Sequence, residues 1–112
     1  MPTEADYILH LSLGLLAECC LNDNVNAIIP RIILNNLAMK INSDEIKLEA
    51  PKHQEWALMM FDKLRADLIP DFISKLKLSD LVNEDVLLNV TKKQLDNRKY
   101  NDAALMMVRY KF

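Results

Sequence analysis

Residues 7–21 read YILHLSLGLLAECCL, which is the most apolar stretch of the chain. Apolar side chains recur there at intervals of three and four residues, and this spacing predicts an α-helix. They form two stripes, one of Ile8, Leu11, Leu15 and Cys19 and the other of Leu9, Leu13, Leu16 and Cys20. Because the two stripes together cover most of the helix circumference, we expect this helix to be packed on several sides.

A start signal stands in front of this helix. Thr3 is a favoured N-cap residue, and Asp6 three residues later resembles the second half of a capping box. We therefore expect the helix to begin directly after Thr3.

The same stretch fits neither a membrane span nor a secretory signal. It has 15 residues and contains Glu18, whereas a span needs about 20 mostly apolar residues. The residues ahead of it are acidic rather than basic. Cys19 and Cys20 are adjacent, which suits neither a disulfide framework nor a zinc site. We expect no membrane partner, no metal or other cofactor, and a cytoplasmic protein, with the nucleus as the alternative.

The overall composition favours helices. The chain has 112 residues with one glycine, and glycine is the usual residue at the positive φ angles of tight hairpins. Its net charge of -2 excludes an overall basic nucleic-acid-binding protein. We expect a single all-α domain over residues 1–112, built as an irregular bundle or a short solenoid of about six helices.

Five further helices are expected after the first. Their approximate ranges are 27–41, 52–68, 71–77, 84–95 and 101–112, with residues 43–51 as a loop between helix pairs. Pro70 should end the third of the six helices and start the fourth. The core candidates are Ile29, Ile33, Leu37 and Ile41 in the second helix and Leu87, Leu88, Val90, Thr91 and Leu95 in the fifth.

The last expected helix stays apolar nearly to its end. The chain stops at Phe112 without a cap or a polar tail, whereas natural ends are usually polar and frayed. We therefore expect this chain to be a piece of a longer protein. A natural terminus docked in a groove is the alternative.

No set of residues predicts a reaction centre. His10 and His53 have no oriented partner that the sequence makes visible, and a general base needs one. Glu18 stands next to the cysteine pair and disfavours a reactive thiolate. We expect no catalytic residue and no enzymatic activity from this chain.

Apolar side chains beyond what six short helices need predict a surface for another protein. Methionine side chains adapt to grooves that accept a partner helix or strand, and tryptophan is a frequent anchor. The predicted partner-binding residues are Trp56, Met59, Met60, Leu105, Met106, Met107 and Phe112. Ordinary core packing is the alternative for each of them.

A basic cluster lies around the joint between the last two expected helices. Residues 92–112 carry six Lys and Arg against two Asp, a net charge of +4. RNA contact through Lys92, Lys93, Arg98 and Lys99 is the alternative function. The simpler interpretation is a solvated helix end, where cations are favourable.

Residues 68–112 carry a recurring order of elements. An apolar helix with Phe72, Ile73 and Leu76 is followed by a Leu81-Val82 joint, another apolar helix, a basic turn and the segment Tyr100-Asn101-Asp102-Ala103-Ala104. This order resembles a unit of tetratricopeptide or HEAT-like helical repeat proteins. It is most similar to the helical region that accompanies the exonuclease domain of Mut-7 and Nibbler type 3′–5′ exoribonucleases.

The resemblance implies a non-catalytic helical region of a small-RNA-processing nuclease, which would dock a partner protein or a guide RNA. The catalytic acidic residues of that family belong to an α/β nuclease domain. No corresponding motif occurs in this chain, so no catalytic residue is carried over.

Overall fold

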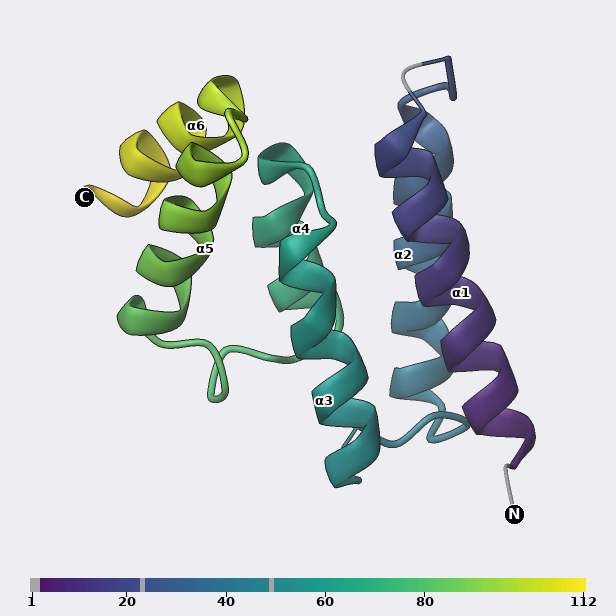
Figure 1. Ribbon diagram of the computed structural model, residues 1–112. Coiled ribbons are helices and arrows are strands. Elements are labelled where there is room, and N and C mark those ends of the chain that lie inside the picture. Colours follow the sequence, from purple (N-terminus) through teal and green to yellow (C-terminus); the bar gives the residue numbers. More distant parts are fainter. Residues whose placement is uncertain (1–2, 23, 49) are drawn as a thin grey trace. The chain divides into compact units, whose positions relative to one another are not determined.

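The computed structural model describes residues 3–22, 24–48 and 50–112 (Figure 1). These residues form six α-helices and two 3-10 helices and contain no strand, so the prediction of an all-α fold is confirmed. The chain divides into two compact units between Lys63 and Leu64, called here the first and the second unit. Within the described ranges, none of the helices combines the length and the apolar composition that crossing a membrane would require.

Three α-helices build the first unit. α1 (Glu4–Leu21) and α2 (Ile28–Asn42) lie side by side as an antiparallel pair, and α3 (Pro51–Met59) packs on α1 (Figure 1). A short 3-10 helix, η1 (Met60–Asp62), continues α3. This arrangement leaves α1 as the element that both other helices contact.

The start of α1 is the predicted capping box. The Asp6 amide donates to the Thr3 hydroxyl at 3.1 Å, and the Thr3 amide donates to the Asp6 carboxylate at 2.8 Å. Two of the amides that a helix start leaves without internal partners are thereby satisfied.

Burial in α1 is one-sided, so the prediction of a helix packed on several sides is wrong. Leu9, Leu13 and Leu16 are buried, whereas Leu11 and Leu15 are at least half exposed. Two adjacent apolar stripes have the same periodicity, and only the position of the neighbouring helices decides which stripe faces them.

The same ambiguity affects α2. Its buried residues are Pro30, Leu34, Leu37 and Ile41. Ile29 is exposed, and Ile33 is only half-buried. The predicted stripe is therefore confirmed at Leu37 and Ile41 and wrong in the first turns, where an adjacent apolar row faces the rest of the unit.

The second unit begins with the 3-10 helix η2 (Ala66–Leu68), which leads into α4 (Ile69–Lys75). α5 (Glu84–Asp96) and α6 (Tyr100–Tyr110) then pack as a pair (Figure 1), and α6 also contacts η2. Phe72 is the largest of the fully buried side chains. It forms the centre of this unit's core together with Leu68, Ile69 and Leu76.

The expected continuous helix over residues 52–68 is wrong. The structure interrupts it between η1 and η2, where Arg65 is extended. At the break the Ala66 amide donates to the Asp102 carboxylate at 3.2 Å instead of to a helix carbonyl. Pro70 lies in the first turn of α4, where its missing amide hydrogen leaves no helix hydrogen bond unmade.

The core candidates of the fifth helix are confirmed in part. Leu87, Val90 and Thr91 are buried as predicted and Leu88 is half-buried, but Leu95 is exposed and Gln94 is buried in its place. The packing of α6 against α5 decides which residue of the last turn of α5 is buried. The spacing of apolar residues alone would have favoured Leu95.

Four helices of the described residues end at a non-glycine residue in the left-handed conformation. These residues are Asp44, Lys77, Arg98 and Lys111, with φ angles between 55° and 63°. At all four the six-to-one hydrogen bond of a Schellman motif is present, and its N···O distance lies between 2.8 and 3.1 Å. The donors are the amides of Glu45, Leu78, Lys99 and Phe112, and the acceptors are the carbonyls of Lys40, Ile73, Gln94 and Met107. The chain places its single glycine, Gly14, inside α1 instead.

Glycine at such a helix end should stabilise the fold. We expect Lys77→Gly to raise the free energy of unfolding by about 1 kcal/mol, because the left-handed conformation costs a residue with a Cβ about that much. Lys92→Gly, in the middle of α5, should lower it by about 1 kcal/mol. Urea unfolding of both variants checks this, and a loss in both would contradict the assignment of strain to Lys77.

Candidate functional site

A pocket of about 140 Å³ opens between α1 and α3 in the first unit. Its lining residues are His10, Leu13, Gly14, Ala17, Trp56, Met59, Met60 and Lys63. The walls are mainly apolar. Of the described residues that line the pocket, none is acidic and Lys63 supplies the permanent charge.

The geometry of Trp56 is set by two histidine rings. The His10 ring on α1 meets the indole edge-on with the ring centroids 5.7 Å apart, and the His53 ring lies tilted at 5.5 Å. Contacts on two sides restrict the rotamers of the tryptophan. The indole is therefore a rigid wall of the pocket, which lowers the entropic cost of binding against it.

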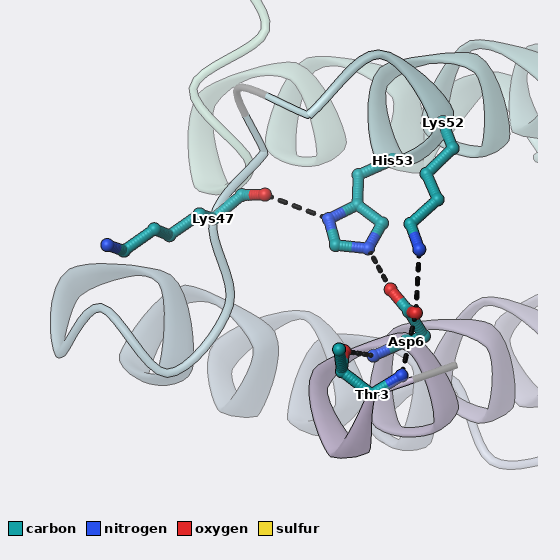
Figure 2. A network of polar contacts seen from close by, with 5 residues as sticks. All are labelled: Thr3, Asp6, Lys47, Lys52 and His53. Atoms are coloured by element: carbon teal, nitrogen blue, oxygen red, sulfur yellow. Dashed lines mark hydrogen bonds and ion pairs between the residues drawn. The ribbon is translucent and has the colours of Figure 1, made fainter. Parts of the chain in front are cut away.

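His53 is held in turn by a buried polar network (Figure 2). Its Nε2 lies 2.5 Å from Oδ1 of Asp6, and its Nδ1 lies 2.8 Å from the backbone carbonyl of Lys47. The Lys52 ammonium donates to Oδ2 of Asp6 at 2.7 Å. Asp6 is 4% exposed and His53 is 5% exposed, so the pair is shielded from water.

Both ring nitrogens of His53 face acceptors. A carboxylate oxygen and a backbone carbonyl oxygen carry no proton, so each needs an N–H donor from the ring. These two contacts fix the orientation of the ring between α1 and the backbone ahead of α3.

The Asp6 carboxylate is strongly stabilised in its ionised form. The hydrogen bond from Lys52, the amide of Thr3 and the His53 ring hold the pKa of Asp6 well below its usual range, although burial acts in the opposite direction. Asp6, the second member of the capping box of α1, is thus also the acceptor that ties α3 to α1.

This network leaves little room for chemistry of its own. Both carboxylate oxygens of Asp6 and both ring nitrogens of His53 already have partners within the chain. In the described part of the chain, no three His, Cys, Asp or Glu residues come together in a way that could hold a metal ion. The arrangement positions Trp56 and the pocket wall through His53.

The predicted partner-binding residues separate into two groups. Trp56, Met59 and Met60 come together at the pocket, where Met59 is 56% exposed and Met60 is 4% exposed. The side chain of Met60 therefore belongs to the core. It lines the pocket from the inside and is not exposed on the surface of the protein. This outcome follows from the turn into η1, which directs Met60 inward.

The second group lies at the end of the second unit. Leu105 and Met107 on α6 are exposed, whereas Met106 is 1% exposed and is a core residue. Phe112 is half-buried, and its ring lies 6.3 Å from that of Tyr110. Met106 is buried because it lies on the same face of α6 as Ala103, which is also buried.

The basic cluster occupies the end of α5 and the turn after it. Lys92, Lys93, Arg98 and Lys99 are all exposed. Arg98 is the left-handed residue of the Schellman motif, so the cations surround the carbonyl end of the helix, where positive charge is favourable. RNA contact through these residues stays a prediction.

Comparisons with known protein families, with curated proteins and with solved structures find no match to this chain.

Two contacts of the site could not be predicted from the sequence. Asp6 and His53 are 47 positions apart, and each has a sufficient local explanation, as a cap and as a residue near a helix start. The contact of His10 with Trp56 depends on the packing of α3 on α1. The one signal that could have pointed to the pocket is Gly14, a glycine in a helix interior, where it is unfavourable.

Proposed function

We propose that this chain is a non-catalytic helical module that docks another protein, and that the pocket between α1 and α3 is its docking site. The observation that carries the proposal is the rigid, partly exposed Trp56 beside Met59 on an apolar pocket. Tryptophan and methionine are enriched in protein interfaces, and tryptophan is frequent among the hot-spot residues at their centres.

The polar network supports this proposal because it stabilises the site without taking part in a reaction. Asp6 and His53 are buried on the inner side of the α1–α3 contact, and their polar atoms have partners within the chain. They keep α3 in the position that presents Trp56 and Met59. A pre-organised surface of this kind loses less conformational entropy when a partner binds.

The process in which this module takes part is a second, more specific proposal. The resemblance of residues 68–112 to the helical regions of exoribonucleases would place the docking event in small-RNA processing. The exposed Leu105 and Met107 on α6 would then be available to a neighbouring domain or partner.

Selection of a displayed peptide library against the intact chain tests the docking site. We expect enriched peptides to lose about tenfold or more in affinity toward Trp56→Ala. Met59→Asp should give a similar loss while keeping the fold, since Met59 is more than half exposed. Met39→Asp is the matched control, because Met39 is an exposed methionine on α2 that does not line the pocket.

Circular dichroism establishes that each variant is folded. Enriched peptides that bind the folded Met59→Asp variant as tightly as the unchanged protein would contradict the proposed site.

A further inference from the structure

The single glycine of the chain lies where a glycine has no conformational reason to be. Gly14 is inside α1, and it is not among the residues with positive φ. The chain meanwhile tolerates residues with a Cβ at four left-handed helix ends. Glycine in a helix interior is about 1 kcal/mol less favourable than alanine. A gain elsewhere has to offset this cost.

That gain is room in the pocket. Gly14 is one of the lining residues, and a Cβ added to it would meet no heavy atom within 4 Å. Close packing of a neighbouring helix against Gly14 therefore does not explain the residue. Gly14 is exposed, and a methyl group on it would stand in open space at the pocket wall.

The size and the charge of the pocket restrict what can enter it. An apolar cavity of about 150 Å³ holds one benzene-sized group, and the pocket here measures about 140 Å³. One aliphatic or aromatic side chain fits this volume. Lys63 lines the pocket and has no acid beside it among the described lining residues, so an anionic group next to that side chain would be favourable.

We propose that the pocket takes a single apolar side chain of a partner protein in which an acidic residue stands next to that side chain. The apolar group enters over Gly14 against the Trp56 indole, and the carboxylate pairs with Lys63. This inference rests on the proposed docking function and specifies the chemistry of the partner. A flat apolar surface could bind a partner without a glycine at position 14 and without a pocket of limited volume.

Blocked pentapeptides of defined sequence test the proposal on the full chain. The probe is acetyl-Ala-Glu-Leu-Ala-Ala-amide, and two matched peptides replace its Glu by Lys or its Leu by Ala. Because Trp56 is the single tryptophan of the chain, its fluorescence reports occupancy of the pocket. We expect the Glu-Leu peptide to bind about threefold more tightly than the Lys-Leu peptide, and the Leu-to-Ala peptide to bind more weakly than both.

Gly14→Ala distinguishes an effect on the pocket from an effect on folding, because binding and stability should change in opposite directions. We expect it to weaken the Glu-Leu peptide about fivefold or more by filling the pocket, and to raise the Tm by a few degrees because alanine favours the helix. Lys63→Gln should remove the preference for Glu over Lys, whereas Lys47→Gln, an exposed lysine outside the pocket, should keep it.

Three outcomes would overturn the inference. They are undiminished binding of the Glu-Leu peptide to Gly14→Ala, equal affinity for the Glu and Lys peptides, and no binding of the Glu-Leu peptide at millimolar concentration. If one of them occurs while library peptides still depend on Met59, the inference fails and the docking function stands. If no library peptide depends on Met59 or Trp56, the docking function fails and the inference fails with it.

Discussion

Asp6→Asn is expected to unfold at a markedly lower urea concentration than the unchanged protein at neutral pH. The substitution removes the charge that faces the His53 ring and the Lys52 ammonium. It leaves the buried ring beside a neutral amide, and a buried group that loses its partner retains its full desolvation penalty. Since this carboxylate ties α3 to α1 and also caps α1, we expect the largest loss among the polar substitutions in the first unit.

The same residue makes the stability of the protein acid-sensitive. The pKa of Asp6 is lower in the folded chain than in the unfolded chain, where it is about 3.9. Its stabilising contribution is therefore complete above that value. It is lost as the pH falls from about 4 through the lower folded pKa, because the folded state must then take up a proton that it binds weakly.

Urea unfolding at a series of pH values, followed by Trp56 fluorescence, checks both expectations. The unchanged protein should lose stability below about pH 4 more steeply than Asp6→Asn does. Glu4→Gln is the matched control, because Glu4 lies in the same first turn of α1 but is exposed. Parallel acid profiles for the unchanged protein and Asp6→Asn would contradict the role assigned to the network.

Phe72→Ala is expected to destabilise the second unit by about 3–5 kcal/mol. The Phe72 side chain is 0% exposed and is the largest fully buried side chain of the described residues, so its removal leaves a cavity in the core. A loss of this size is a large part of the stability of a small domain.

Amide hydrogen exchange locates this effect. Protection in α4, α5 and α6 should fall together in Phe72→Ala, since these helices belong to the unit whose core contains Phe72. Val108→Ala, on the exposed side of α6, should change stability by less than about 0.5 kcal/mol. Similar losses in the two variants would contradict the placement of Phe72 at the centre of the core.

The helix starts show how far local reasoning reaches. Thr3 with Asp6 predicted the first turn of α1, and Pro70 predicted a helix start near residue 70. These signals are readable because the partners lie within three or four positions of each other, where the backbone alone brings them together.

The candidate site was only partly predictable, because its residues are brought together by contacts between helices and not by neighbours in the chain. Trp56 and Met59 are three positions apart on a predicted helix, and this spacing placed them on one surface. Burial of Met60 and Met106 could not be read from the pattern, since an apolar residue has the same character in a core and in an interface.

The order of residues by itself determined that this chain is helical, where most of its helices begin and end, and that Thr3 and Asp6 cap the first helix, because those properties depend on neighbours in the chain. Only the tertiary structure decided which apolar stripe of α1 is buried, where the helix between residues 52 and 68 breaks, and that Asp6 meets His53. The physical reason is distance along the chain. Contacts between residues nearly 50 positions apart form when helices pack, and the periodicity of a single helix carries no record of which neighbour it will meet.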